Sequence, residues 1–388
     1  ATVEAAHLQA LSHGTTYTIT VALSADAAGN TATSDTGDTF TYDNAVAAAS
    51  ESTAITTPTK DTTPNAIISV AEVGTIAVAG TSGCALTSTS TMASGTNTIT
   101  LGTFSTNAAY VCTVTFTDTA GNAASALSLT SFTLDTTAPT ISTVAFASGD
   151  YVNNAEDESA INLVITMSDA TADGRVATAT LNSADYTCTI SSNACTASIT
   201  SAGLKALTDG TSYSFSVAIS DAAGNAATAH TSESFIYDIT VAAASESTAV
   251  TTPTKDTTPD AIISVAEAGT IAVGGTNGCA LTSTSTMASG SNTITLGTFS
   301  TNQAYVCTVT FTDTAGNAAA ALDLTSFTLD TVAPTISTVA FASGDYVNNA
   351  EDESAINLVI TMSDATADGR VATATLNSAD YTCTISSN

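Results

Sequence analysis

The sequence repeats itself at a spacing of 195 residues, and this repeat constrains the fold more than any other feature. Residues 43–193 and 238–388 differ at only twelve of 151 positions, and from Ala138 and Ala333 onward the two copies are identical. Self-similarity at a fixed period is typical of arrays in which one unit is used many times and each unit contacts mainly its neighbours. We therefore expect several similar domains in a row.

Two short motifs divide each repeat. The loop motif Asp-x-Ala-Gly-Asn recurs at 26–30, 118–122, 221–225 and 313–317. Asp-Thr-rich joints recur as DTTP at 61 and 256, as DTTAP at 135 and as DTVAP at 330. These motifs predict A modules at 43–135 and 239–330, a B module at 136–238, the second half of a B module at 1–42 and the first half of one at 331–388.

On this division the chain begins and ends inside a domain. One interpretation is that the sequence is a window of a longer chain. Another is that residues 331–388 are completed by residues 1–42 of a second molecule through strand donation. A half-sandwich standing alone would expose an unpaired edge and an open core.

The apolar residues alternate in short runs, which predicts β-strands. In the run YVCTVTFT at 110–117, Cys112, Val114 and Phe116 share one face and threonines the other. The following run changes parity between Leu129 and Phe132, which predicts a bulge near Thr130–Ser131. Short strands separated by Gly, Asn and Asp turns indicate an all-β fold of tandem Ig-like β-sandwiches in a linear array.

Composition excludes several functions. The net charge is −30, because the chain has 35 acidic residues and only five Lys and Arg. Five basic residues cannot neutralise a run of phosphates, so nucleic-acid binding is excluded. No apolar run approaches the ~18 residues of a membrane helix. A high-salt cytosolic protein could be this acidic, but acids gathered at loops would instead suit a hard cation such as calcium.

The motifs together resemble a known family. In the A modules they are TPTKDTTP, EVGTIAVAGTSGC, AYVCTVTFTDTAGN and SFTLD, and in the B module DTTAPTISTVAF, DGTSYSFSVAISDAAGN and SFIYD. With these motifs the whole chain resembles the bacterial and archaeal immunoglobulin-like repeats of giant surface adhesins and fibres. The resemblance implies an extracellular load-bearing or adhesive array, often calcium-dependent, and supplies no ligand.

The seven cysteines sort by module. If the turn between Cys188 and Cys195 closes a hairpin, the two residues lie across from each other. We predict three disulfides, Cys84–Cys112, Cys188–Cys195 and Cys279–Cys307, and hence an oxidising compartment. Cys383 matches Cys188, and its partner would fall past the last residue. Buried free thiols are the alternative. A zinc site is a weaker interpretation of these cysteines, because no CxxC occurs and the three histidines are not at ligand spacing.

Acidic residues at the start of the B module form a candidate calcium site. In an Ig-like sandwich, the loop between the last two strands and the loop after the second strand both face the preceding joint. Four carboxylates could then converge there: Asp135, Asp169, Asp173 and Asp221. The A module offers a poorer set in Asp61, Glu72 and Asp118. The alternative is turn chemistry, because Asp and Asn cap their own backbone and Gly supplies positive φ.

The sequence contains no GxSxG, HExxH, P-loop or GxGxxG motif, so we expect no enzyme. The leading hypothesis is a structural repeat segment of an extracellular fibre or adhesin stalk, whose partners are neighbouring repeats and whose hydroxyls could carry O-linked glycan. A self-assembling filament subunit closed by strand donation is an alternative. A carbohydrate-binding array is another, which the absence of Trp disfavours.

Overall fold

The computed structural model describes residues 2–81, 83–275, 277–363 and 367–386, and the fold in this part of the chain is all-β. Helical segments are short: α1 (Ala5–Gln9), the 3-10 turn η1 (Ala170–Ala172) and α2 (Ser201–Leu204). Among the described residues, none of the helices has the length and apolar character needed to cross a membrane. The chain divides into two compact units, one made of Ala1–Val152 with Glu156–Tyr237 and the other of Asn153–Ala155 with Asp238–Asn388.

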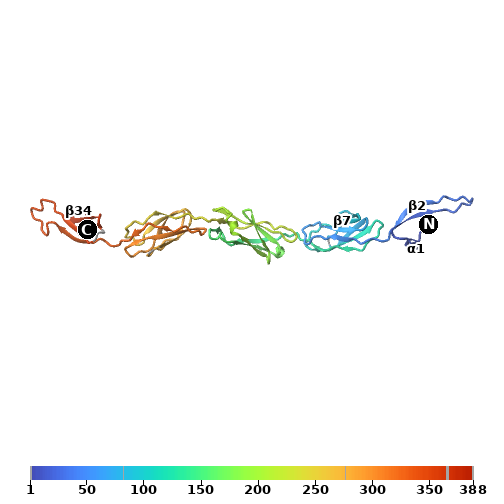
Figure 1. Ribbon diagram of the computed structural model, residues 1–388, viewed down its shortest axis with the longest axis horizontal. Helices are drawn as coiled ribbons and strands as arrows, with labels where there is room; N and C mark the ends of the chain where they lie inside the picture. The colour runs from blue at the N-terminus through green and yellow to red at the C-terminus, as the bar shows by residue number, and fades with distance from the viewer. Residues whose placement is uncertain (1, 82, 276, 364–366, 387–388) are drawn as a thin grey trace. The chain divides into compact units, whose positions relative to one another are not determined.

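The first A module is a sandwich of small, mainly antiparallel sheets, coloured light blue to cyan in Figure 1. One sheet has the order β3-β4-β7, a second β10-β9-β5-β6, and a third pairs β11 with β8. The strands are β3 (Ser50–Thr53), β4 (Asn65–Val70), β5 (Gly74–Gly80), β6 (Thr91–Met92), β7 (Gly95–Thr100), β8 (Ala109–Tyr110), β9 (Cys112–Asp118), β10 (Leu127–Ser128) and β11 (Phe132–Thr133).

The inward faces of these strands form one core. Cys112, Val114 and Phe116 of β9 are buried, as their alternation predicts, while the intervening threonines are half-buried. They pack with Ile68 of β4 and Ile99 of β7 in a single hydrophobic cluster. Because period-2 alternation places every second side chain on one face, burial of that face fixes the register of the strands.

The bulge predicted near Thr130–Ser131 is confirmed. Ser128 pairs with Thr113 and the Leu129 backbone N donates to the Cys112 carbonyl at 2.9 Å, whereas Phe132 pairs with Tyr110. Thr130 and Ser131 therefore lie opposite the single residue Val111, which is one extra residue in the last strand. Glu51 of β3 holds the bulge, because its Oε2 accepts hydrogen bonds from the Thr130 backbone N at 2.8 Å and from Thr130 Oγ1 at 2.7 Å.

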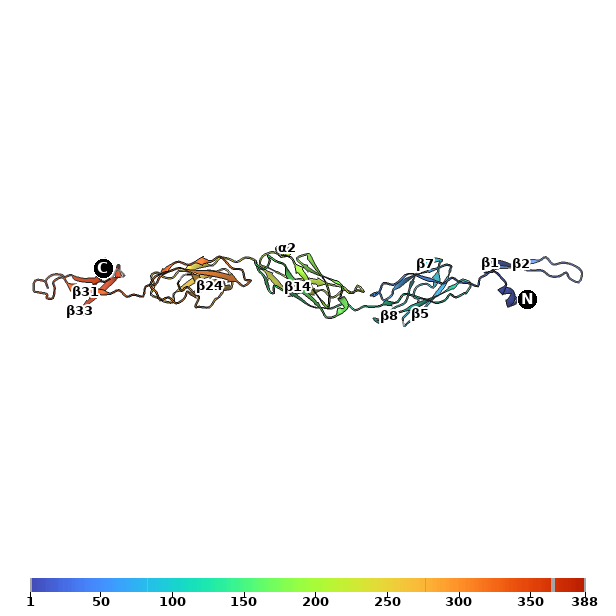
Figure 2. The same ribbon diagram turned by 60° about the horizontal axis from the view of Figure 1, so that its bottom comes forward.

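The B module, green in Figure 1, has three sheets with the orders β12-β14-β17, β13-β21-β18 and β16-β15-β19-β20. Figure 2 labels β14 and α2 of the same module in a turned view. Its strands are β12 (Ile141–Phe146), β13 (Tyr151–Val152), β14 (Ile161–Met167), β15 (Val176–Leu181), β16 (Ala184–Thr189), β17 (Ala194–Ile199), β18 (Thr211–Tyr213), β19 (Ser216–Ala218), β20 (His230–Thr231) and β21 (Phe235–Tyr237).

Two tyrosines fix the end of the B module that leads to Asp238. The Tyr213 Oη accepts a hydrogen bond from the Thr208 backbone N at 2.9 Å, the Tyr-containing corner expected from LTDGTSY. Tyr237 donates its hydroxyl to Asp157 Oδ2 at 2.7 Å. Burial first, and then the hydrogen bond to Asp157, raise the pKa of Tyr237. Tyr237 therefore stays a neutral donor, and both tyrosines join loops to strands through their hydroxyls.

The second A module repeats the first within its own unit, with sheets β22-β23-β26, β25-β24-β28-β29 and β27-β30. Its strands are β22 (Ser245–Thr248), β23 (Asp260–Val265), β24 (Gly269–Gly275), β25 (Thr286–Met287), β26 (Gly290–Thr295), β27 (Ala304–Tyr305), β28 (Cys307–Asp313), β29 (Leu322–Asp323) and β30 (Phe327–Thr328).

The two end segments, predicted to be half-modules, consist of antiparallel strand pairs. Residues 1–42 contain β1 (Thr15–Val21) paired with β2 (Asp35–Tyr42), and both strands are largely exposed. Residues 331–388 contain two antiparallel pairs, β31 (Ile336–Phe341) with β32 (Leu358–Met362) and β33 (Val371–Leu376) with β34 (Ala379–Thr384). Cys383, on β34, is an exposed free thiol.

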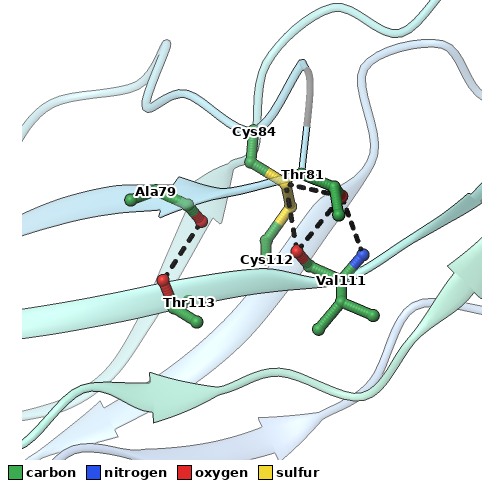
Figure 3. The surroundings of a disulfide bond; sticks show 6 residues. All are labelled: Ala79, Thr81, Cys84, Val111, Cys112 and Thr113. Carbon is green, nitrogen blue, oxygen red and sulfur yellow. Dashed lines mark hydrogen bonds between the residues drawn. A yellow bond between two sulfur atoms is a disulfide. The ribbon is translucent and has the colours of Figure 1, made fainter.

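The structure contains the three disulfides at the pairs expected from the sequence, Cys84–Cys112, Cys188–Cys195 and Cys279–Cys307. In Figure 3, Cys84 reaches from the loop after β5 to Cys112 at the start of β9, with the Val111 carbonyl beside the bridge. Gly80, at φ +138°, lies opposite Cys112, and a Cβ there would meet the Val111 carbonyl oxygen at 2.4 Å. The disulfide therefore lies beside a position, Gly80, where a residue with a Cβ would clash with the neighbouring strand.

The turn between Cys188 and Cys195 closes as a hairpin, because Ser191 and Ala194 form an antiparallel bridge and exchange backbone hydrogen bonds of 2.9 and 3.2 Å. The strands that carry the two cysteines then separate. Cys188 belongs to β16 and Cys195 to β17, and these strands lie in different sheets. The short turn between them crosses from one sheet to the other, with Ser192 and Asn193 at positive φ. This disulfide thus ties the two layers of the sandwich together at their edges.

Candidate functional site: the joints between modules

Each Asp-x-Ala-Gly-Asn loop is a closed turn held by its own first and last residues. In the first A module, Asp118 Oδ1 accepts the Asn122 backbone N at 2.8 Å and Asp118 Oδ2 accepts Asn122 Nδ2 at 2.7 Å. The Asp118 backbone N in turn donates to the Asn122 carbonyl at 3.1 Å. Asp26–Asn30, Asp221–Asn225 and Asp313–Asn317 make the same pairs of side-chain bonds. The turn chemistry considered from the sequence is therefore present.

The asparagine of the loop also holds the joint that precedes its module. Asn225 Nδ2 donates to the Asp135 carbonyl at 2.8 Å, and Asn317 Nδ2 donates to the Asp238 carbonyl at 2.8 Å. Asn122 makes a longer contact, 3.3 Å, with the Asp43 carbonyl. The loop between the last two strands thus faces the preceding joint, as expected, and the amide fixes the backbone of that joint.

Acidic side chains gather at the joints that precede the A modules. Asp43, Glu72 and Asp118 each present a carboxylate oxygen, and these oxygens lie within 4.8 Å of one another. The equivalent residues of the second copy, Asp238, Glu267 and Asp313, form the same group. We call these groups the Asp43 triad and the Asp238 triad. Three segments build each one: the joint, the loop after the second strand and the Asp-Thr-Ala-Gly-Asn loop.

The members of the Asp43 triad differ in environment. Asp118 is buried, with 5% of its surface exposed, whereas Asp43 and Glu72 are half-buried. Burial alone would raise the pKa of Asp118, but hydrogen bonds from the Asn122 side chain and from the loop backbone outweigh it and lower the pKa. Asp118 is therefore ionised at neutral pH and available to a cation. Carboxylates from separate segments, with outer members open to solvent, are the donor set that Ca²⁺ prefers.

The four residues predicted to bind calcium at the B module do not form such a group among the described residues. Asp135 Oδ1 accepts Asn107 Nδ2 at 3.2 Å and the Thr137 backbone N at 3.0 Å. Asp169 Oδ1 accepts the Thr171 backbone N at 3.0 Å and so caps η1.

The other two members of that set are also hydrogen-bonded within the B module. Asp173 Oδ1 accepts the Asn193 backbone N at 3.0 Å, and Asp221 is held by Asn225. Convergence of all four on one cation remains a prediction. Their present partners are the turn and cap donors that Asp ordinarily finds.

Two residues at the A-module joints were missed by reasoning from the sequence. Asp43, and not the predicted Asp61, lies with Glu72 and Asp118. Asp43 comes directly before the first A module, as Asp135 comes directly before the B module. His13 could not have been found by spacing, because it comes from the half-module 1–42. Its Nδ1 lies 3.2 Å from Asp43 Oδ1.

The family comparison supports the fold. The model of the Bacterial Ig-like domain (group 3) family matches residues 100–241, which span the end of the first A module and the whole B module. No curated protein matches the sequence. The chain is thus an all-β tandem array of Ig-like domains, and residues 100–241 are similar to the bacterial type of this domain.

Solved structures that match the chain include two bacterial adhesins. One is a Ca²⁺-stabilised adhesin with which an Antarctic bacterium reaches out and binds ice, at 23% identity over 81% of each chain and a TM-score of 0.37. The other belongs to a 1.5-MDa bacterial ice-binding adhesin, at 19% identity over 69% of this chain and 88% of that one, with a TM-score of 0.34. Fibronectin(III)-like modules of Clostridium thermocellum CbhA match at 14% identity over 50% and 95%, with a TM-score of 0.32.

Proposed function

We propose that this chain is a load-bearing segment of an extracellular fibre or adhesin stalk, which gives reach and mechanical stability and performs no catalysis. The observation that carries the proposal is that the last strand of each complete module pairs in parallel with a segment that follows the first strand. In the first A module the Thr59 backbone N donates to the Thr133 carbonyl at 2.9 Å, and the Asp135 backbone N donates to the Thr59 carbonyl at 2.9 Å. This pairing is parallel, because Thr59 bridges Leu134 in the parallel sense.

The other complete modules share this arrangement. β13 pairs with β21 in parallel in the B module, and Thr254 bridges Leu329 in parallel in the second A module. When the two ends of such a module are pulled apart, parallel terminal strands slide along each other. Their hydrogen bonds are then loaded together instead of opening one by one. A module built this way resists force more than its equilibrium stability alone would require, because forced unfolding depends on the unfolding rate.

Force spectroscopy on the intact chain tests this role. Thr59→Pro removes the backbone donor to Thr133, so we expect the unfolding force of one A module to fall while the second A module unfolds as before. Thr59→Val is the matched control, because it keeps the backbone donor. Unchanged forces in a folded Thr59→Pro variant would contradict the proposal.

The compartment belongs to the same proposal. Three disulfides are rare in a reducing cytosol, so we infer an oxidising, extracellular location. The array contacts mainly its own neighbouring repeats, and exposed threonines such as Thr98 and Thr187 offer hydroxyls to O-linked glycan. Mass spectrometry of the native protein would detect the glycan as added hexose-type mass on Thr- and Ser-rich peptides.

We further propose that calcium binds the Asp43 and Asp238 triads and stiffens the joints that precede the A modules. Three carboxylates around a point must otherwise repel one another, and a divalent cation removes this repulsion. Thermal melting with calcium and with a chelator tests the proposal. We expect the midpoint to fall with the chelator, and the same midpoint in both conditions would contradict it.

A further inference from the structure

The joint at Asp135 has no carboxylate triad among the described residues, but it holds one of the five basic residues of the chain. Lys60, near the end of the A module that adjoins the B module, donates its Nζ to the Gly224 carbonyl of the B-module loop at 2.7 Å. These residues are 164 positions apart in the sequence and belong to the same compact unit. A hydrogen bond from an ammonium to a carbonyl is charge-assisted and stronger than one between neutral groups.

The backbone on either side holds Lys60 at this joint. Thr59, the preceding residue, exchanges backbone hydrogen bonds with Thr133 and Asp135 in the last strand of the A module. The joint itself is held from both modules. Asn107 of the A module accepts the Thr136 backbone N at 3.1 Å, and Asn225 of the B module binds the Asp135 carbonyl at 2.8 Å.

The position of Lys60 has a counterpart at the other kind of joint. Lys60 follows the parallel bridge between Thr59 and Leu134, and Asn153 follows the parallel pair of Val152 with Tyr237. Asn153 Nδ2 donates to the Ala315 carbonyl at 2.9 Å, in the loop that carries Asp313 of the Asp238 triad. The same structural position therefore supplies a neutral amide where three carboxylates gather, and an ammonium where they do not.

We propose that Lys60 is the built-in cation of the Asp135 joint: it docks the A module onto the Asp-Ala-Ala-Gly-Asn loop of the B module without a metal ion. The proposal rests on the stalk function given above. A fixed ammonium beside the loop also repels a divalent cation, so it competes with the calcium site predicted from Asp135, Asp169, Asp173 and Asp221. The two kinds of joint then differ in what holds them, a bound cation before an A module and a lysine before a B module.

The second A module supplies a matched control. Lys255 lies in the same sequence, TPTKDTTP, but residues 331–388 contain no Asp-x-Ala-Gly-Asn loop. Among the described residues, Lys255 makes no hydrogen bond like the one that Lys60 donates to Gly224. Lys255→Met therefore removes the same side chain from the same local sequence, where the described residues include no counterpart of the Gly224 loop.

The experiment measures distances between spin labels by electron–electron resonance in the full chain. Labels at the exposed strand positions Thr98 and Thr187 report on the Asp135 joint, and labels at Thr18 and Thr98 report on the Asp43 joint. With a chelator present, we expect Lys60→Met to increase the population outside the main Thr98–Thr187 distance peak by roughly two- to fivefold, the range for one exposed charged contact. Lys255→Met and Lys60→Arg should leave that peak unchanged.

Either of two results would overturn the proposal. One is an unchanged Thr98–Thr187 distribution in Lys60→Met. The other is a broadened distribution in the unmutated chain on chelation alone, which would assign the joint to a metal ion. The Thr18–Thr98 pair keeps the two proposals separate: if chelation leaves it unchanged, the calcium proposal fails while the result for Lys60 stands.

Discussion

The Asp43 and Asp135 joints share a scaffold and differ in charge. At each, the asparagine of an Asp-x-Ala-Gly-Asn loop binds the carbonyl of the joint aspartate. At Asp43 two further carboxylates complete a triad, whereas at Asp135 the aspartate is occupied by Asn107 and Thr137. The same asparagine-to-carbonyl hydrogen bond therefore occurs at a joint rich in carboxylates and at one that is not. It suits both, because an amide–carbonyl hydrogen bond carries no net charge.

The first prediction separates the stability of a module from that of its joints, and has the largest expected effect. Replacing both Cys84 and Cys112 by Ser opens a loop with a sequence separation of 28, and replacing Cys188 and Cys195 opens one of 7. Chain entropy then predicts losses of about 3.6 and about 2.4 kcal/mol in the free energy of unfolding. Urea unfolding followed by circular dichroism measures both. Equal losses would show that native-state strain, rather than loop length, sets the contribution.

The second prediction concerns calcium at the Asp43 triad. If calcium is present at 100 times its dissociation constant, binding stabilises the first A module by about 2.7 kcal/mol. Glu72→Gln should abolish the calcium-dependent stabilisation of the first A module. The second A module keeps Glu267 and should still be stabilised by calcium. Calorimetric melting with and without calcium resolves the two. Loss of both gains in the single variant would mean that the triads do not act independently.

The third prediction tests the shared backbone device. Asn225→Ala removes the donor to both Asp221 and the Asp135 carbonyl, so we expect a loss of about 1–3 kcal/mol from buried groups left unpaired. Asn30→Ala is the control, because Asn30 is exposed and its side chain makes the same turn bond, to Asp26. Chemical unfolding measures both variants. A loss at Asn30 as large as that at Asn225 would show that the turn, rather than the joint contact, carries the stabilisation.

The fourth prediction uses the lowered pKa of Asp118 and has the smallest effect near neutral pH. Because the pKa of Asp118 in the folded chain lies below the ordinary value of Asp, about 3.9, ionised Asp118 stabilises the fold above that value, and this stabilisation is lost as pH falls through the lowered pKa. Asp118→Asn should therefore flatten the acid limb of the stability curve below about pH 4. Urea unfolding at several acid pH values measures the slope. An unchanged slope would place the titrating group elsewhere.

Reasoning from the sequence found the all-β tandem array, because alternation and the 195-residue repeat are local or periodic signals. The strand β9 and its buried Phe116 followed from alternation alone. The bulge at Thr130–Ser131 followed from the change of parity. The placement of Cys188 and Cys195 in different sheets did not follow, because spacing cannot tell a continuing hairpin from one whose strands separate. The triads combine segments about 30 and 45 residues apart, and only the fold shows which acids face each other.

Isothermal titration of the chelator-treated chain with calcium tests the central claim, that the joints preceding the A modules hold cations and the joint preceding the B module does not. The account predicts two binding events per chain, one lost in Glu72→Gln, both lost in Glu72→Gln/Glu267→Gln, and neither lost in Asp169→Asn. No binding heat in the unmutated chain, or heat that survives the double variant and disappears in Asp169→Asn, would contradict it.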